Sequence, residues 1–435
     1  MLINFTLENF RSINERITLD MQAMGQVSEL KVNVIDAPRQ KLLKSAVIYG
    51  ANGSGKSNII KGLNFFTHFV KTSIDSQEGD PIPNVIPFLL GPKELGKRPS
   101  SFEMEFLIDG SKFRYGFEAT SEKIYGEWLF RLPKGGRKER NLFLREEQTI
   151  EVSKKNFREG LDLEGKTRNN SLFLSVCAQF NGEIAKSLLL FFNRLNGISG
   201  VEDRRLRNFT TQYIKDADSY TMVLKLLDQA DIGIEGIVEE KPFEKELPPG
   251  LPEDIPEDFK EDLRKTSILY TERKAYDSKG REFGVRRMPF DEAESAGTKK
   301  YFHLLGPIRD TLHRGGILVV DELDARLHPK LTLNIIRMFH DPEINRRGAQ
   351  LIFATHDTNL LASGLFRRDQ IFFTEKNRSA ATDLYSLAEF KLESGASVRK
   401  DANFEINYLK GRYGAIPFMG SLDLFKIFQS IERED

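Results

Sequence analysis

Apolar and polar residues alternate along the first part of the chain, as they do in β-strands that bury one face. Alternating runs at 3–7 and 17–21 predict an antiparallel β-hairpin at the start of the chain. A second hairpin is expected over 101–118, because Asp109-Gly110 separates two further alternating runs and is a strong turn signal. This part of the chain therefore predicts an antiparallel β-sheet.

The middle of the chain has a more mixed pattern. Short strands are expected around Trp128 and at 150–152, and helical periodicity predicts helices near 184–192 and 220–227. The stretch 239–261 is rich in proline and glutamate, which predicts an exposed loop. Because no heptad pattern persists, a long coiled-coil arm is not expected.

Strand and helix patterns alternate from 315 to 375, which is typical of a parallel sheet covered by helices. The expected buried strands are 317–320, 351–354 and 370–373. Beyond them, helices are expected near 404–408 and from Leu422. The later part of the chain therefore predicts an α/β fold.

The bulk composition is that of a soluble globular protein, and the length predicts either two domains or one domain with a large insertion. The chain has 435 residues, of which 40% are hydrophobic, and its 64 basic and 64 acidic residues cancel. Net charge therefore argues neither for nor against nucleic acid as a partner. The single cysteine, Cys177, excludes an intrachain disulfide and fits a reducing cytosol. No apolar run is long enough to span a membrane, and the start of the chain lacks a signal-peptide core, so a cytoplasmic location is expected.

The stretch 50–57 reads Gly-Ala-Asn-Gly-Ser-Gly-Lys-Ser and fits the phosphate-binding loop motif at every fixed position. An apolar strand at 46–49 precedes it, and residues at helical spacing follow it. In this setting the loop N–H groups bind phosphate oxygens, Lys56 reaches the β- and γ-phosphates of ATP, and Ser57 holds Mg²⁺. The alternative is a glycine- and serine-rich turn that merely precedes a helix.

The run 317–320 ends in Asp321 and Glu322, which is the arrangement of a Walker B strand. Asp321 is expected to hold Mg²⁺ through water, and Glu322 to accept a proton from the water that attacks the γ-phosphate. The alternative is a strand that ends in two solvated acids.

Two further segments bear on the class of ATPase. Ser295 precedes an apolar helical pattern and is expected to cap it, and Gly297 and Thr298 lie in the first turn, whose free N–H groups can bind an anion. Because the phosphate loop already serves one nucleotide, this second anion site is expected to serve a γ-phosphate held by another subunit. His356 ends the strand after Walker B and can contact the γ-phosphate or orient water, although a lone histidine there is often structural.

These motifs resemble the ATP-binding-cassette (ABC) ATPases, and within them the SMC/RecF-like branch. The resemblance covers 1–118 and 290–375, and it implies a signature motif at 295–298, a D-loop at 323–325 and a switch histidine at His356. It also implies ATP and Mg²⁺ as cofactors and an ATP-dependent homodimer or higher oligomer. The nucleotide-binding residues it implies are Asn52, Gly53, Ser54, Gly55, Lys56, Ser57, Asn58, Arg11, Ser295, Gly297 and Thr298. The Mg²⁺ ligands it implies are Ser57, Asp321 and Gln179, the last taken from a glutamine that follows a strand at 172–175.

The expected fold class is α/β: an ABC-ATPase-type phosphate-loop fold with an N-terminal antiparallel β subdomain and a largely helical inserted lobe. Four ranges are expected to divide the chain. They are 1–118 and 290–390 for the two halves of the ATPase domain, 119–289 for the inserted lobe, and 391–435 for a segment that contacts a partner.

The order of motifs and the tail at 408–417 also resemble stand-alone ATPase subunits of bacterial anti-phage operons, such as those of PARIS and Septu. This resemblance implies a sensor or regulatory ATPase that controls a separately encoded effector, often a Toprim-type nuclease or a toxin. The alternative is a DNA-clamping ATPase of repair or recombination, for which 204–207 and 286–287 are candidate basic clusters. Such clusters are more often a solvated face.

Overall fold

The computed structural model describes residues 1–91, 95–199, 204–241, 252, 255–265, 267–392 and 395–417. Contacts divide the chain into two compact units. Unit 1 comprises Met1 and Arg194–Leu351, and unit 2 comprises Leu2–Asn193 and Ile352–Asp435. The four ranges that the sequence predicts follow motifs instead of contacts, and they remain a prediction. None of the helices in the described ranges has both the length and the apolar character needed to cross a bilayer.

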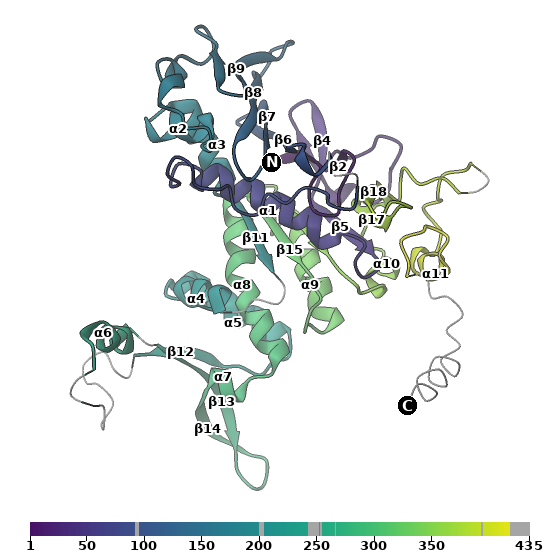
Figure 1. Ribbon diagram of the computed structural model, residues 1–435. Coiled ribbons are helices and arrows are strands. Elements are labelled where there is room, and N and C mark those ends of the chain that lie inside the picture. Colours follow the sequence, from purple (N-terminus) through teal and green to yellow (C-terminus); the bar gives the residue numbers. More distant parts are fainter. Residues whose placement is uncertain are drawn as a thin grey trace, which may run out of the picture. The chain divides into compact units, whose positions relative to one another are not determined.

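A seven-stranded antiparallel sheet dominates unit 2 (Figure 1). Its strands, in spatial order, are β10 (Thr149–Val152), β9 (Arg140–Glu146), β8 (Ile124–Leu132), β7 (Ser111–Ala119), β6 (Ser100–Ile108), β1 (Leu2–Glu8) and β2 (Ile17–Asp20). Both predicted hairpins are confirmed, since β1 pairs with β2 and β6 pairs with β7. At the tip of the second hairpin, Asp109 and Gly110 have φ values of 48° and 78°, and positive φ at both positions is what a type I′ turn requires.

Helix α1 (Lys56–Thr72) packs its apolar side on this sheet through aromatic rings. Phe66 stacks on Phe117 of β7 with ring centroids 5.3 Å apart and meets Phe5 of β1 edge-on at 5.7 Å. Gly62 allows the close approach, because a Cβ there would lie 2.7 Å from a methyl group of Leu7. Each fully buried phenylalanine stabilises the fold by about 1.5–3 kcal/mol, so this cluster holds α1 firmly on the sheet.

A buried ion pair ties the far strands of the sheet to helix α2 (Phe173–Gln179). Glu127 and Arg145 are both shielded from solvent and lie 3.8 Å apart. The Glu127 carboxylate accepts the backbone N–H groups of Phe173 and Leu174 at the start of α2, at 2.6 and 3.0 Å, and the hydroxyl of Tyr115 at 2.9 Å. Burial raises the pKa of Glu127, while Arg145 and these donors oppose the rise. The network fixes where α2 begins. Helix α3 (Glu183–Phe192) follows α2.

A second sheet in unit 2 carries the parallel strands. Strands β16 (Gln350–Ala354), β5 (Ser45–Gly50), β17 (Ile371–Lys376) and β18 (Thr382–Ser386) are neighbours in that order. Strands β5 and β17 are parallel, and β18 returns antiparallel to β17. The predicted strands at 351–354 and 370–373 are therefore confirmed, as is the helix near 404–408, which is α11 (Phe404–Leu409). The helix expected from Leu422 lies outside the described residues. Short elements complete the unit: β3 (Val34–Ala37), β4 (Gln40–Leu43) and α10 (Asn359–Ala362).

Unit 1 contains the parallel strands β11 (Leu195–Ser199) and β15 (Ile317–Asp321), and the long helix α8 (Ala296–Arg314). It also holds an antiparallel three-stranded sheet in the order β12, β13, β14. The described residues of unit 1 also form the helices and strands α4 (Arg204–Tyr213), α5 (Ala217–Gln229), β12 (Gly236–Glu240), α6 (Glu257–Lys265), β13 (Ile268–Tyr276), β14 (Glu282–Pro289), α7 (Phe290–Ala293) and α9 (Pro329–His340).

The prediction of an exposed loop over 239–261 is wrong at both ends. Strand β12 reaches Glu240, and α6 begins at Glu257. Glu257 forms ion pairs with Lys260 at 3.4 Å and Arg264 at 3.1 Å, and charge pairs of this kind support a polar helix that apolar periodicity does not reveal. The stretches 242–251 and 253–254 lie outside the described residues.

Candidate nucleotide site

The phosphate loop connects β5 to α1, as the sequence predicts (Figure 1). Gly53 and Gly55 have φ values of 76° and 115°, a region that side chains other than glycine rarely occupy. A Cβ on Gly50 would lie 2.3 Å from the Thr374 hydroxyl, and one on Gly55 would lie 2.1 Å from the Thr382 hydroxyl. Next to Gly53 the space is open, because no atom lies within 4 Å of a Cβ placed there. The glycines therefore permit both the tight turn and a ligand beside it.

Lys56 points back into the loop that precedes it. Its ammonium group donates to the carbonyl oxygens of Gly50 at 2.7 Å and Ala51 at 3.1 Å. The side chain is 6% exposed. The cation is thus held beside the loop N–H groups, which suits a triphosphate chain that needs both.

A network of serine and threonine hydroxyl groups is hydrogen-bonded to the phosphate loop. Ser54 and Thr374 share a hydrogen bond of 2.6 Å between their hydroxyls, and Thr382 donates its hydroxyl to the Ser54 carbonyl at 2.8 Å. The hydroxyls of Thr382 and Ser12 lie 2.8 Å apart, and the Asn58 amide donates to Ser12 at 2.7 Å. This chain of contacts joins the N-terminal turn to the loop. The sequence gives no local signal for Thr374 and Thr382, which lie more than 300 positions from the loop.

A pocket of about 820 Å³ opens on the Gly50 side of the loop. His356 also lines this pocket, and its role as a switch histidine remains a prediction. Tyr49, which also lines it, donates its hydroxyl to the carbonyl of Asp357 at 3.1 Å and so ties the histidine segment to the strand before the loop. The lining residues are Tyr49, Gly50, Ala51, Asn52, Thr355, His356, Thr358, Glu375, Tyr408, Leu409, Gly411, Gly414, Ile416 and Pro417. Sequence reasoning missed Glu375 and the part from Tyr408 to Pro417 as parts of this site.

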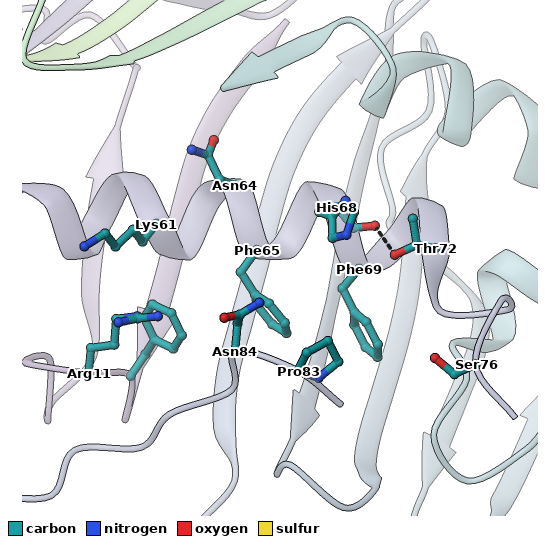
Figure 2. Close-up of a pocket in the computed structure, with 11 residues that line it drawn as sticks. Arg11, Lys61, Asn64, Phe65, His68, Phe69, Thr72, Ser76, Pro83 and Asn84 are labelled. Atoms are coloured by element: carbon teal, nitrogen blue, oxygen red, sulfur yellow. Dashed lines mark hydrogen bonds between the residues drawn. The ribbon is translucent and has the colours of Figure 1, made fainter. Parts of the chain in front are cut away.

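A second pocket of about 350 Å³ lies along α1 and contains Arg11 (Figure 2). Figure 2 shows Arg11 beneath Lys61 of α1, with the rings of Phe65 and Phe69 pointing towards Asn84 and Pro83. Arg11 has a φ of 54°, its backbone N–H donates to Ile86 at 2.7 Å, and its guanidinium lies 5.4 Å from the ring of Phe10. The Nε atom of Arg11 is buried without a hydrogen-bond partner. The pocket joins cationic groups to an apolar floor.

The structure does not bring Gln179 to the Mg²⁺ site. The expected strand at 172–175 is the first part of helix α2, and Gln179 is the last residue of that helix. The Ser175 hydroxyl donates to Val70, in the last turns of α1, at 2.6 Å. Since a helix rises about 1.5 Å per residue, this contact lies roughly 20 Å from Ser57, at the opposite end of α1. An apolar run of four residues fits a strand and a buried helix equally well, which is why the strand prediction failed.

Unit 1 carries the other predicted motifs. Asp321 is the last residue of β15, and Glu322 follows it with a φ of 57°. Such a conformation costs energy in a residue other than glycine and is often found at functional sites.

The predicted cap at Ser295 is confirmed. Its hydroxyl accepts the N–H of Thr298 at 3.1 Å at the start of α8, and Ser295 is exposed. A Cβ on Gly297 would lie 2.9 Å from the Arg326 carbonyl, so glycine allows this helix start to pack against the D-loop segment. Whether this exposed helix start binds an anion remains a prediction.

A protein-family model described as "AAA domain, putative AbiEii toxin, Type IV TA system" matches residues 45–362. The chain belongs to this family. The matched residues of this AAA domain include the phosphate loop, the signature segment, Asp321, Glu322 and His356. Arg11 and the segment from Tyr408 to Pro417 lie outside them.

The comparison with curated proteins found no match. Among solved structures, the SMC head domain from Thermotoga maritima is similar, with 13% identity and a TM-score of 0.40, over 88% of this chain and 98% of that one.

The chain is an ATPase of the AAA type, and its α/β class with an N-terminal antiparallel sheet is confirmed. Its residues fit ATP with Mg²⁺. The loop offers open space beside Gly53 and a held cation at Lys56, and Ser57 places a hydroxyl in the first turn of α1. Mg²⁺ in such sites takes one or two protein oxygens together with phosphate oxygens and water. Ser57 is the residue of this loop that would supply one of those protein oxygens.

Proposed function

We propose that this protein binds and hydrolyses ATP with Mg²⁺, and that its nucleotide state controls a separate effector in defence against phage. The observation that carries the ATPase part is the position of Lys56. Its ammonium group is held by the carbonyl oxygen of Gly50, and Gly50 and His356 both line the pocket beside the loop. Lys56 would bind the β- and γ-phosphates, and His356 would contact the γ-phosphate or orient the attacking water. Glu322 would accept a proton from that water.

The pocket beside the loop and the pocket along α1 suggest which way the nucleotide lies. The Gly50 side, with His356, suits the terminal phosphate. The pocket along α1 begins at Arg11 and Lys61, one turn beyond Ser57, and its aromatic floor suits a base or ribose. Arg11 would then supply positive charge near the inner phosphates, in keeping with the role that the sequence predicts for it.

The capped start of α8 would serve a second copy of the chain. The start of this helix carries partial positive charge, and Ser295 is exposed there, which suits a negatively charged ligand from another chain. In this proposal each ATP lies between the phosphate loop of one copy and Ser295, Gly297 and Thr298 of another. Association of the copies then depends on the γ-phosphate.

The effector part of the proposal rests on the resemblance to anti-phage ATPase subunits and on the family description, which names a toxin. A Toprim-type nuclease or a toxin encoded nearby is the expected partner, and the stretch 391–435 is the segment proposed to contact it.

DNA clamping is the alternative, but the basic clusters offer it little support. Arg207 pairs with Asp291 at 3.0 Å, and Arg287 pairs with Glu272 and Glu240 at 2.8 and 3.0 Å. Paired charges attract a phosphate backbone less than free ones do.

The test of this proposal combines mass measurement with nucleotide titration. The Glu322→Gln chain, which should not turn over ATP, is expected to form a dimer or larger assembly with ATP and magnesium but not with ADP. Adding Ser295→Arg should leave ATP binding intact and abolish the assembly, and Ser363→Arg serves as a matched change elsewhere. Assembly that is unaffected by Ser295→Arg would contradict the composite site. Affinity purification with neighbouring gene products, with and without ATP, tests the effector.

A further inference from the structure

The pocket beside Gly50 has a wall made by the part of the chain that follows α11. We call this the C-terminal wall and define it by Tyr408, Leu409, Gly411, Gly414, Ile416 and Pro417. We propose that the C-terminal wall, together with Glu375, distinguishes ATP from ADP: a terminal phosphate loosens the wall, and ADP does not. This inference rests on the proposed ATPase function, because it assigns the terminal phosphate to this pocket.

An aromatic contact couples the wall to the phosphate loop. The ring of Tyr408 lies 5.7 Å from the ring of Tyr49 and 5.3 Å from that of Phe373. Tyr49 is the residue immediately before Gly50, and its hydroxyl bonds to Asp357, next to His356. A shift of the loop or of the histidine segment is therefore passed directly to Tyr408.

The conformation of the C-terminal wall depends on a few close contacts, so the displacement of one contacting side chain would disturb it. Gly411 and Gly414 have φ values of 71° and 68°, which favour glycine. A Cβ on Gly414 would lie 2.6 Å from a carboxylate oxygen of Glu375 and 2.8 Å from the Tyr385 hydroxyl. The Tyr385 hydroxyl donates to the carbonyl of Tyr413 at 2.7 Å and lies 3.2 Å from Glu375. The turn of the wall is thus seated on the end of β17 and on β18.

Glu375 supplies the sensitivity to charge. It is exposed, lies at the end of β17 beside the loop strand β5, and lines the same pocket as Gly50 and His356. A terminal phosphate in this pocket would bring negative charge close to the Glu375 carboxylate, and like charges at short range repel. The carboxylate can relieve the repulsion by turning away, and this removes the surface on which Gly414 rests. ADP lacks that charge and leaves the contact in place.

Amide hydrogen exchange over 404–417 tests the proposal with three samples: no nucleotide, ADP, and a non-hydrolysable ATP analogue, all with magnesium. We expect the analogue to speed exchange several-fold in this segment and ADP to leave it unchanged. Fluorescent-nucleotide titration on the same samples reports binding separately. A protein that binds neither nucleotide overturns the proposed function and this inference together, whereas equal binding with the same exchange in ADP and analogue overturns this inference alone.

Two variants and one control sharpen the test. Glu375→Gln should bind the analogue but lose its effect on exchange, because the repulsion is gone. Asp383→Asn is the control, since Asp383 faces Glu375 across the strand pair, is exposed and does not line the pocket; it should behave like the parent chain. Tyr408→Phe keeps the ring but removes the hydroxyl that donates to Ala415 at 3.1 Å, and should speed exchange without nucleotide. A persistent analogue effect in Glu375→Gln refutes the charge argument.

Discussion

Thr210 of α4 donates its hydroxyl to the carbonyl oxygen of His303 in α8, 2.9 Å away. Pro307 lies four residues after His303 and has no N–H, so this carbonyl cannot receive its normal helical hydrogen bond. The same hydroxyl accepts the N–H of Gly306 at 3.2 Å, and a Cβ on Gly306 would lie 2.5 Å from it. A side chain from another helix thus supplies the hydrogen bond that proline removes from α8, the helix that Ser295 caps.

We predict that Thr210→Val destabilises unit 1, because it removes the hydroxyl that donates to a buried carbonyl, at a cost of about 1–3 kcal/mol. Thr210→Ser keeps the hydroxyl and is the matched control, expected to lose only the small packing contribution of a methyl group. The measurement is the midpoint of urea unfolding monitored by circular dichroism. Equal midpoints for the valine and serine variants would show that the hydrogen bond contributes nothing.

Cys177 provides a second prediction, about local opening of unit 2. It is fully buried in α2, and burial raises the pKa of its thiol well above the usual range. Only the thiolate reacts with disulfide reagents, so native protein should label very slowly and show little acceleration from about pH 7 to about pH 9, where an ordinary thiol ionises. Labelling should become fast and stoichiometric in denaturant. Rapid labelling of the native protein at neutral pH would mean that α2 does not stay packed as described.

Lys56→Ala should weaken ATP binding at least roughly tenfold. It removes the ammonium group that the loop carbonyls of Gly50 and Ala51 hold in place, and hydrogen bonds to charged groups are worth about 1.5–3 kcal/mol each, or at least roughly tenfold in affinity. Lys71→Ala, in the last turn of the same helix, is the control and should bind like the parent chain. The check is calorimetric titration with ATP and magnesium. Tight ATP binding by the Lys56 variant would contradict the assignment of the phosphate loop to the ATP site.

The parts of the fold that the sequence predicts well are those with local causes. The hairpin at Asp109-Gly110 depends on two adjacent positive φ angles, and the cap at Ser295 on a hydroxyl three residues before the N–H that it accepts. The phosphate loop likewise occupies consecutive residues. In each case the physical reason lies within a few positions of the chain, where pattern reasoning can see it.

The parts that the sequence does not predict depend on distant contacts. Thr382 reaches both Ser12 and Ser54, although it lies over 300 positions from either, and threonine at a strand start is unremarkable on its own. The Glu127 carboxylate accepts the first N–H groups of α2 and so favours a helix in a run of residues that fits a strand equally well. Nothing near Tyr408 in the sequence indicates that its ring will pack on Tyr49.

Glu322→Gln separates ATP binding from hydrolysis. Glutamine has the same size as glutamate and would have to adopt the same backbone φ of 57°, so the fold should be unaffected. It removes the carboxylate that would accept the proton of the attacking water, and loss of a general base slows such reactions by about 100-fold or more. Phosphate release should fall accordingly while ATP affinity stays within about threefold of the parent chain, a difference of less than 1.4 kcal/mol in binding free energy. Glu343→Gln changes an exposed acid of the same unit, paired with Arg346 at 2.9 Å, and should hydrolyse ATP normally. If the Glu322 variant released phosphate at the parental rate, the proton acceptor would have to be another group, and His356, which lines the pocket beside the loop, would be the first to replace.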